Sequence, residues 1–197
     1  MVHRYDPLMV YLMVVSHSDD ADASALSALD EDAQKQIRDA FIIGDDRTFD
    51  EDPRYGLVAL SQIAGRAMSP AINDPGTVID ILATYARLFD LWCQSTDESE
   101  SECTQKAALY QGVAVPRLSL DAMFEDAFGA IGRDAAANEE VAVRLQTVIA
   151  SLASTGYPGA KAAARKQATI ALERAEASLQ IDHDLKAVRE ASIASTS

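Results

Sequence analysis

The chain has 197 residues, 48% of them hydrophobic, and a formal net charge of -14 at pH 7. This length and hydrophobic content allow a real core in one domain, with or without a helical extension, and they exclude a disordered chain. The negative charge argues against nucleic acids and anionic membrane surfaces as partners, because both would repel the protein.

The N-terminal region contains one short apolar run, Leu8–Val15, which is rich in β-branched and aromatic residues. Residues Pro7–Val15 are therefore predicted to form a buried strand. The run is far too short to span a membrane and lacks the flanks of a signal peptide, so we expect a soluble, cytoplasmic chain. A helix is then predicted to begin at Ser27 or Asp30 and to end at Gly44.

Two helices with a tight corner between them are predicted next. Apolar residues recur at helical spacing over residues 52–68 and again over residues 78–92. Pro70 ends the first helix, because a residue that precedes proline is disfavoured in the α region. Asn73 or Asp74 then supplies the cap of the second helix. The two apolar stripes and the short connection predict an antiparallel pair in the core.

The helical pattern is lost after the second of these helices. Residues 95–102 are acidic and rich in serine, which is typical of a solvated loop. Residues 107–118 indicate a short hairpin around Gln111-Gly112, with Pro116 marking an edge strand. We therefore expect a mainly α fold, a helical bundle with a small β element made of this hairpin and the N-terminal strand.

The remainder of the chain is predicted to be helical. Ser119 and Asn138 each cap an amphipathic helix. The alanine-rich residues 160–192 contain enough helical positions to extend for ~45 Å. The pattern divides the chain into a helical domain with minor strands, residues 1–157, and a C-terminal helical extension, residues 158–197.

The C-terminal extension predicts a homo-oligomer. Its small-residue face permits close helix approach, and its apolar residues exceed what one neighbouring helix would cover. In a two-fold arrangement, its basic start could meet the acidic body of a second subunit. The alternative is that the extension folds back to complete the core of its own domain, which needs no partner.

No cofactor, metal site or catalytic set is predicted. Cys93 and Cys103 lack C-x-x-C spacing and are typical of reduced thiols, although a disulfide across the turn between them stays open. His3, His17 and His183 are too scattered to suggest a metal site or a triad. The pattern therefore favours a protein that is not an enzyme.

The two central helices and their corner resemble a known family. The residues that match its pattern are Arg47-Thr48, Asp52, Gly56-Leu57, Ile63-Ala64, Arg66-Ala67, Ser69-Pro70, Ile72-Asn73-Asp74-Pro75 and Thr77. In these residues the chain resembles the predicted membrane-protein family called domain of unknown function 2254, over a region from about Pro7 to Leu152. Met68, Gly76 and Val78 depart from the family's usual residues.

The resemblance implies a location and no reaction. Members of this family carry transmembrane helices before the matched region and are attached to membranes. We therefore expect the present chain to correspond to the family's soluble portion alone, without direct insertion into a membrane. The activity of the family is unknown, so the resemblance assigns no substrate and no catalytic residue.

Seven polar residues are candidates for a site at the corner: Arg47, Asp52, Arg66, Ser69, Asn73, Asp74 and Thr77. In a structural interpretation, Arg66 pairs with Asn73 or Asp74 in a buried network that sets the helix crossing. In a ligand interpretation, two arginines beside a helix N-terminus bind a carboxylate or phosphate. Alternatively, Asp52, Asn73 and Asp74 offer oxygen atoms to Mg²⁺ or Ca²⁺.

The first hypothesis for function is a non-catalytic helical interaction or regulatory module, which in longer family members would lie beside a membrane domain. The alternative is a small-anion or divalent-ion sensor at the Arg66/Asn73/Asp74 corner. An enzyme of unrecognised type is the third hypothesis. The exposure of the corner discriminates between them, since a dry, self-paired corner indicates a structural role and an open one permits ligand binding.

Overall fold

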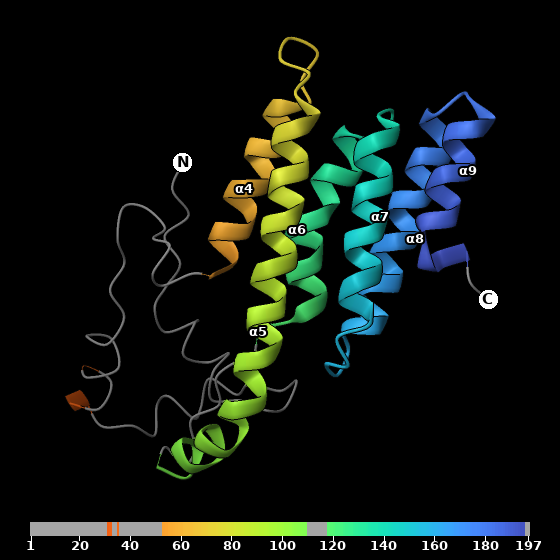
Figure 1. Ribbon diagram of the computed structural model, residues 1–197. Coiled ribbons are helices and arrows are strands. Elements are labelled where there is room, and N and C mark those ends of the chain that lie inside the picture. Colours follow the sequence, from red (N-terminus) through yellow and green to blue (C-terminus); the bar gives the residue numbers. More distant parts are fainter. Residues whose placement is uncertain (1–30, 33–34, 36–52, 110–117, 196–197) are drawn as a thin grey trace. The chain divides into compact units, whose positions relative to one another are not determined.

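The computed structural model describes residues 31–32, 35, 53–109 and 118–195. The chain divides into two compact units, and the account below concerns the unit formed by Arg47–Glu98 and Leu118–Ser197. The helices are α4 (Pro53–Ala67), α5 (Pro75–Leu109), α6 (Leu120–Asp134), α7 (Glu139–Ala153), α8 (Ala160–Ser178), α9 (Asp182–Ala191) and the short 3-10 helix η1 (Ile193–Ser195) (Figure 1).

Local side-chain caps explain where two of these helices begin. The Ser119 hydroxyl accepts a hydrogen bond from the Ala122 amide at the start of α6, at 3.4 Å. The Asn138 side chain accepts one from the Val141 amide at the start of α7, at 3.0 Å. Both predicted caps are confirmed, because a cap depends only on a short polar residue and the amides of the next turn.

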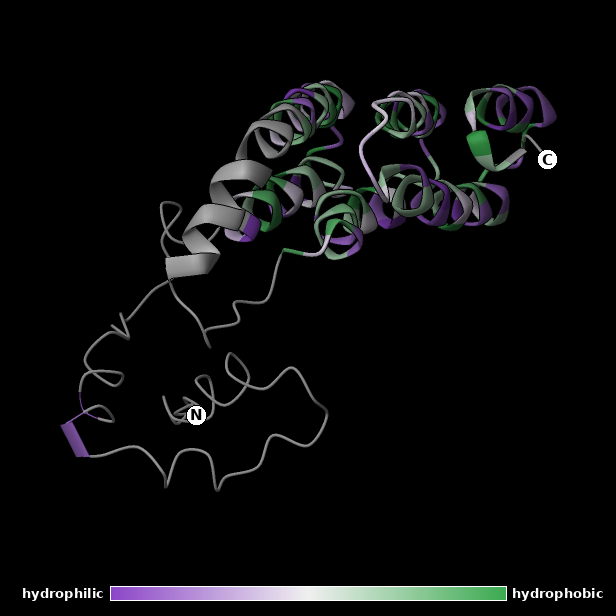
Figure 2. Ribbon diagram, turned by 90° about the horizontal axis from the view of Figure 1, so that it is seen from below, coloured by the Kyte–Doolittle hydropathy of each residue, from purple (hydrophilic) through white to green (hydrophobic). Residues whose placement is uncertain are grey.

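The helices alternate in direction and form successive antiparallel pairs (Figure 1). Helix α4 packs against α6, and α6 packs against α8, whereas α7 packs against both α8 and α9. Figure 2 views the helices nearly end-on and shows the short pieces of chain that join them. The consecutive pairs are α4–α5, α6–α7 and α8–α9, and each pair contacts mainly the pair that follows it in the chain. The unit therefore resembles a short stack of helical hairpins.

An aromatic cluster joins α5 to α6 in the core. Tyr85 and Phe89 on α5 meet Phe124 and Phe128 on α6, and all four side chains are almost fully buried. The ring centroids of Phe89 and Phe124 lie 4.7 Å apart, and those of Tyr85 and Phe128 lie 5.6 Å apart in an edge-to-face arrangement. Such rings bury large apolar areas, so this cluster anchors α5 in the unit.

Small residues bring α8 close to α6 and α7. Its buried face consists mainly of alanines: Ala160, Ala163, Ala164, Ala168, Ala171 and Ala175. A Cβ atom placed on Gly132 of α6 would lie only 3.4 Å from the Cβ of Ala171, which shows how closely these helices approach. The small-residue face of the C-terminal segment is therefore used inside its own unit.

The predicted small β element is wrong within the described residues, which contain no strand. Residues 107–109, assigned to a hairpin, and residues 95–102, assigned to a loop, both belong to α5. No glycine or proline lies between Gly76 and Gly112, so nothing in the sequence interrupts this helix. The predicted strand at residues 7–15 lies outside the described residues. The mainly α class is confirmed.

The C-terminal segment is not one long helix. It breaks after Ser178, where Leu179 is extended, and α9 then returns along α7. This return buries Val188 completely, next to Ala142 of α7 and Ala175 of α8. The segment thus packs against α6 and α7 of its own unit, and the predicted homo-oligomer stays a prediction. The predicted division of the chain at residue 157 stays a prediction.

Candidate functional site

The predicted corner is an exposed turn between α4 and α5. The Asn73 amide donates to the Ser69 carbonyl at 2.9 Å, and the Asp74 amide donates to the Ala67 carbonyl at 2.8 Å. Asn73 has a φ of 47°, a left-handed conformation that asparagine tolerates better than most residues. These backbone bonds give the turn a defined shape. Two of the seven predicted corner residues, Arg47 and Asp52, lie outside the described residues.

Asp74 is the N-cap of α5. Its carboxylate accepts a hydrogen bond from the Thr77 hydroxyl at 2.6 Å and another from the Thr77 amide at 3.2 Å. These two hydrogen bonds hold the pKa of Asp74 below its ordinary value of 3.8, and the bond from the hydroxyl has the larger effect. Pro75 follows in the first turn, where a missing amide hydrogen costs nothing. Two of the seven predicted residues are thus joined, and their role is to start a helix.

The predicted burial of the corner is wrong. Arg66, Asn73 and Asp74 are exposed, and Ser69 and Thr77 are only half-buried. Within the described part of the chain, Arg66 has no ion pair with Asp74 or with any other carboxylate. The reason is helical phase, since the buried residues Leu57 and Ala64 lie on the opposite side of α4 from Arg66.

These contacts predict different outcomes for two corner substitutions. Arg66→Ala should leave the melting temperature close to that of the parent, because the side chain is exposed. Asp74→Ala should lower the melting temperature at neutral pH, because it removes the cap of α5. Thermal melts followed by circular dichroism measure both, and a large loss of stability in Arg66→Ala would contradict the exposed corner.

The Asp74 cap also predicts a dependence on pH. The pKa of Asp74 in the folded protein lies below its ordinary value of 3.8. The carboxylate therefore contributes its stability above about pH 4 and loses it as the pH falls through the folded-state pKa. The difference in melting temperature between the parent and Asp74→Ala should shrink on acidification, and a constant difference would show that the charge is irrelevant.

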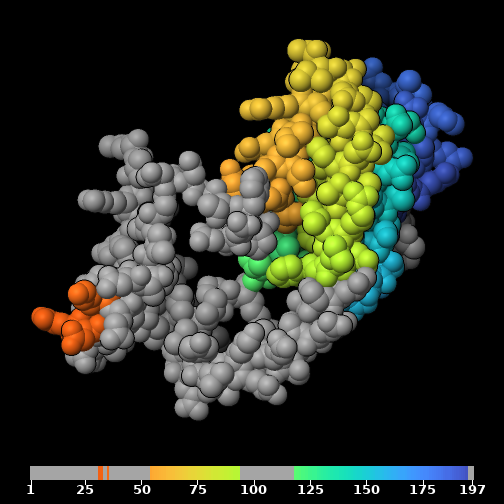
Figure 3. Space-filling model, turned by 60° about the vertical axis from the view of Figure 1, so that its left-hand side comes forward, coloured from red at the N-terminus to blue at the C-terminus, as the bar shows by residue number. Residues whose placement is uncertain are grey.

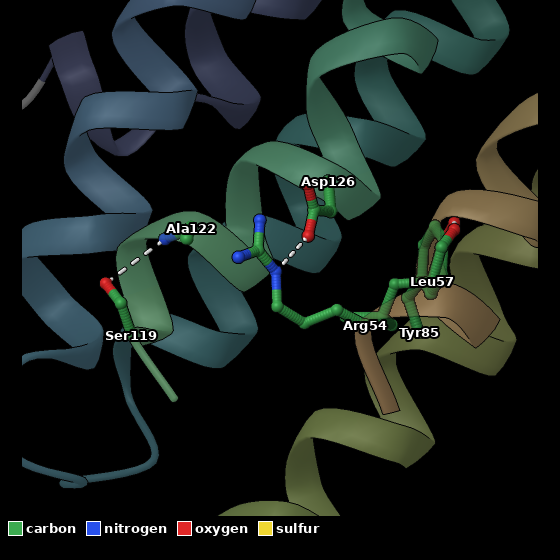
Figure 4. A network of polar contacts seen from close by, with 6 residues as sticks. All are labelled: Arg54, Leu57, Tyr85, Ser119, Ala122 and Asp126. Carbon is green, nitrogen blue, oxygen red and sulfur yellow. Dashed lines mark hydrogen bonds and ion pairs between the residues drawn. The ribbon is translucent and has the colours of Figure 1, made fainter. Parts of the chain in front are cut away.

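A second polar cluster, which the sequence did not indicate, joins α4, α5 and α6 (Figure 4). The Arg54 Nε atom lies 2.6 Å from Oδ2 of Asp126, so a partly buried ion pair links α4 to α6. The Tyr85 hydroxyl donates to the Leu57 carbonyl at 2.7 Å and links α5 to α4. Arg54 and Asp126 are 72 residues apart, and no local pattern relates them.

The contacts of this second cluster hold three helices together. Burial raises the pKa of Tyr85, a nearby Ser61 hydroxyl opposes the shift, and the Asp126 charge adds to it. The phenol therefore stays protonated at neutral pH, and the Asp126 carboxylate is already paired with a guanidinium. A charge-assisted pair of this kind fixes geometry between the helices.

A cavity of about 10 Å³ beside Gln146 is too small for a substrate. Gln146 is buried, and its Nε2 donates to the Ala168 carbonyl at 3.0 Å. Such a volume holds at most a single water molecule. Among the residues that the structure describes, no three His, Cys, Asp or Glu side chains are grouped so that they could hold a metal ion. None of the described helices is both long and apolar enough to cross a membrane.

Residues 7–151 match the family described as "Predicted membrane protein (DUF2254)". The chain belongs to this family. The matched region ends inside α7, so α8 and α9 lie beyond it although they pack in the same unit. The function of this family is unknown, so membership assigns no reaction to the protein.

Curated relatives share one short stretch with this family member. Over 40 residues it is 50% identical to an uncharacterized protein of Mycobacterium bovis and to one from each of two strains of Mycobacterium tuberculosis. The stretch covers 20% of the present chain and only 8% of the length of each relative. No solved structure matches the chain.

Proposed function

We propose that this protein is a non-catalytic helical module that binds another polypeptide through the α4–α5 hairpin. The observation that supports this is a set of large apolar side chains in water: Ile63 is 49% exposed, Leu91 is 62% exposed and Leu88 is 42% exposed. We call these three residues the outer face. Exposed large apolar side chains mark an interaction site where they gather on one surface.

The outer face lies on the side of the hairpin that is turned away from α6. Ile63 lies on the opposite side of α4 from Arg54, because nine residues turn a helix through about 180° beyond two full turns. The Arg54 side chain reaches α6. On α5, the buried side chain of Phe89 contacts the aromatic rings of α6, whereas Leu88 and Leu91 project elsewhere. Figure 3 shows α4 and α5 side by side on one face of the molecule.

The family supplies a context for this proposal. In a longer member with a membrane domain, a helical module with an open apolar face would assemble or regulate that domain by contact. The cluster of Arg54, Tyr85 and Asp126 joins helices, and the corner residues Asp74 and Thr77 cap one.

The alternative of a small-anion or divalent-ion sensor at the Arg66/Asn73/Asp74 corner stays a prediction. A free anion is disfavoured there, because the Asp74 carboxylate already occupies the N-terminus of α5. Thermal shifts measured separately with phosphate, Mg²⁺ and Ca²⁺ test it. A shift that depends on ligand concentration and disappears in Arg66→Ala or Asp74→Asn would favour the sensor.

Photocrosslinking tests the interaction module directly. A photoreactive phenylalanine analogue is placed at Ile63 or Leu91 in the full chain in living cells, and at the exposed Arg144 of α7 as a control. We expect the first two positions, and not the third, to give a crosslinked product larger than the chain itself. Equal labelling at all three positions, or no product at any, would overturn the proposal.

A further inference from the structure

The side-chain amide of Gln146 on α7 is buried and only half satisfied. Gln146 is 1% exposed, and its Nε2 donates to the Ala168 carbonyl of α8 at 3.0 Å. Because only the nitrogen of the amide can donate to a carbonyl, this bond fixes which way the amide is turned. Oε1 then has no hydrogen-bond partner among the described residues. A buried acceptor in this position costs stability unless another group bonds to it.

The small cavity beside Gln146 lies where three helices meet. Its wall is formed by the end of α6, the first half of α7 and one alanine of α8. Gln146 is the one polar residue in this wall, which otherwise consists of apolar residues and Gly132. The volume of about 10 Å³ corresponds to roughly one water molecule, so a larger ligand is excluded.

The backbone at the end of α6 offers two further polar groups to this cavity. The Ile131 carbonyl accepts from the Ala135 amide, and the Ala135 carbonyl accepts from the Asn138 amide, both at 2.9 Å. The Gly132 carbonyl and the Ala136 amide make no backbone hydrogen bond of this kind to any described residue. Both residues are buried and both line the cavity. Groups at a helix end that lack a partner in the chain are commonly satisfied by water.

We propose that this cavity binds one water molecule, which donates to Gln146 Oε1 and to the Gly132 carbonyl and accepts from the Ala136 amide. Buried water molecules typically make about three hydrogen bonds, and these groups supply that number. The water joins α6 to α7, and the Nε2 bond of Gln146 joins α7 to α8. The site is independent of the interaction module, which uses α4 and α5.

Ser61 does not support a second site of this kind, although its Oγ atom also lacks a partner among the described residues. The Ser61 hydroxyl opposes the rise in the pKa of Tyr85, so the two hydroxyl groups lie close together. A hydroxyl hydrogen rotates to suit its surroundings, and Ser61 can thus reach a protein acceptor. The amide oxygen of Gln146 has no such freedom, and a cavity adjoins Gln146.

Magnetisation transfer between water and the protein, measured by NMR on the isotope-labelled full chain, tests the proposal. We expect a cross-peak between water and the Ala136 amide, with the sign of dipolar transfer from a long-lived buried water. No residue in the cavity wall carries a hydroxyl group, so none of them can relay the signal by hydrogen exchange. A high-resolution crystal structure of the parent should show the same water within hydrogen-bond distance of Gln146 Oε1.

Gln146→Met should abolish the cross-peak, because methionine fills a similar volume and lacks the amide oxygen. Gln167→Met is the matched control, since Gln167 is 3% exposed on α8 and does not line the cavity. This variant should keep the cross-peak at the parent's intensity. The amide spectrum of each variant reports whether its fold is that of the parent.

Three results would overturn the water site. They are a parent without the cross-peak, a cross-peak that persists in Gln146→Met, and a cross-peak that Gln167→Met removes equally. The last result would show that any change in the core has this effect. The parent spectrum and the parent crystal structure decide whether the water is bound even if Gln146→Met does not fold.

Discussion

Replacing Phe128 with alanine should lower the free energy of unfolding by about 4 kcal/mol. Phe128 is 1% exposed and contacts three other rings of the core, those of Tyr85, Phe89 and Phe124. The substitution removes a large buried apolar area and leaves a cavity between α5 and α6 that rigid neighbours fill only in part. Because small domains are stable by only about 5–15 kcal/mol, this loss is a large share of the total.

Urea unfolding followed by circular dichroism measures the effect of Phe128→Ala. The control is Ile181→Ala, which also removes a large apolar side chain but from a position that is 60% exposed. The control should unfold at nearly the same urea concentration as the parent. If the two variants lose similar stability, the aromatic cluster is not the main contact between α5 and α6.

Replacing Ala168 with leucine should destabilise the protein by about 3 kcal/mol. Ala168 is fully buried on the small-residue face of α8, and its carbonyl accepts the hydrogen bond from Gln146 of α7. A leucine at this position needs space that the close approach of the helices does not provide. The helices must therefore separate or adopt strained rotamers, and either response weakens the hydrogen bond as well.

Ala177→Leu is a matched control for Ala168→Leu. Both positions are alanines of α8, so the change in side chain is identical and the change in helix propensity is similar, but Ala177 is exposed. We expect thermal melts of the control to coincide with those of the parent. Equal destabilisation by the two substitutions would mean that α8 is not tightly packed against α6 and α7.

The corner shows which parts of a site can be read from local sequence. The cap of α5 was predicted at Asn73 or Asp74 from local sequence alone, and the structure assigns it to Asp74, which bonds to Thr77 three residues on. The environment of Arg66 was predicted wrongly. Its burial depends on which side of α4 meets the other helices, and one apolar stripe that is broad and partly exposed does not define that side.

The ion pair between Arg54 and Asp126, by contrast, could not be predicted from local sequence. Each residue is a polar position of an amphipathic helix, and on its own each is typical of a solvated surface. Their ion pair exists because α4 and α6 pack side by side, so it is a property of the packing. The same is true of the outer face, since the apolar spacing over residues 52–68 and 78–92 does not indicate which of the residues in these helices stay exposed.

By itself, the sequence determined the mainly α class, the two central helices, a cap at Asn73 or Asp74, the caps at Ser119 and Asn138, and the membership of the family. These features depend on periodicity and on contacts within one helical turn. Tertiary structure alone decided that α9 folds back along α7. Weak local preferences leave this outcome open, and the burial of Val188 against Ala142 of α7 and Ala175 of α8 selects it.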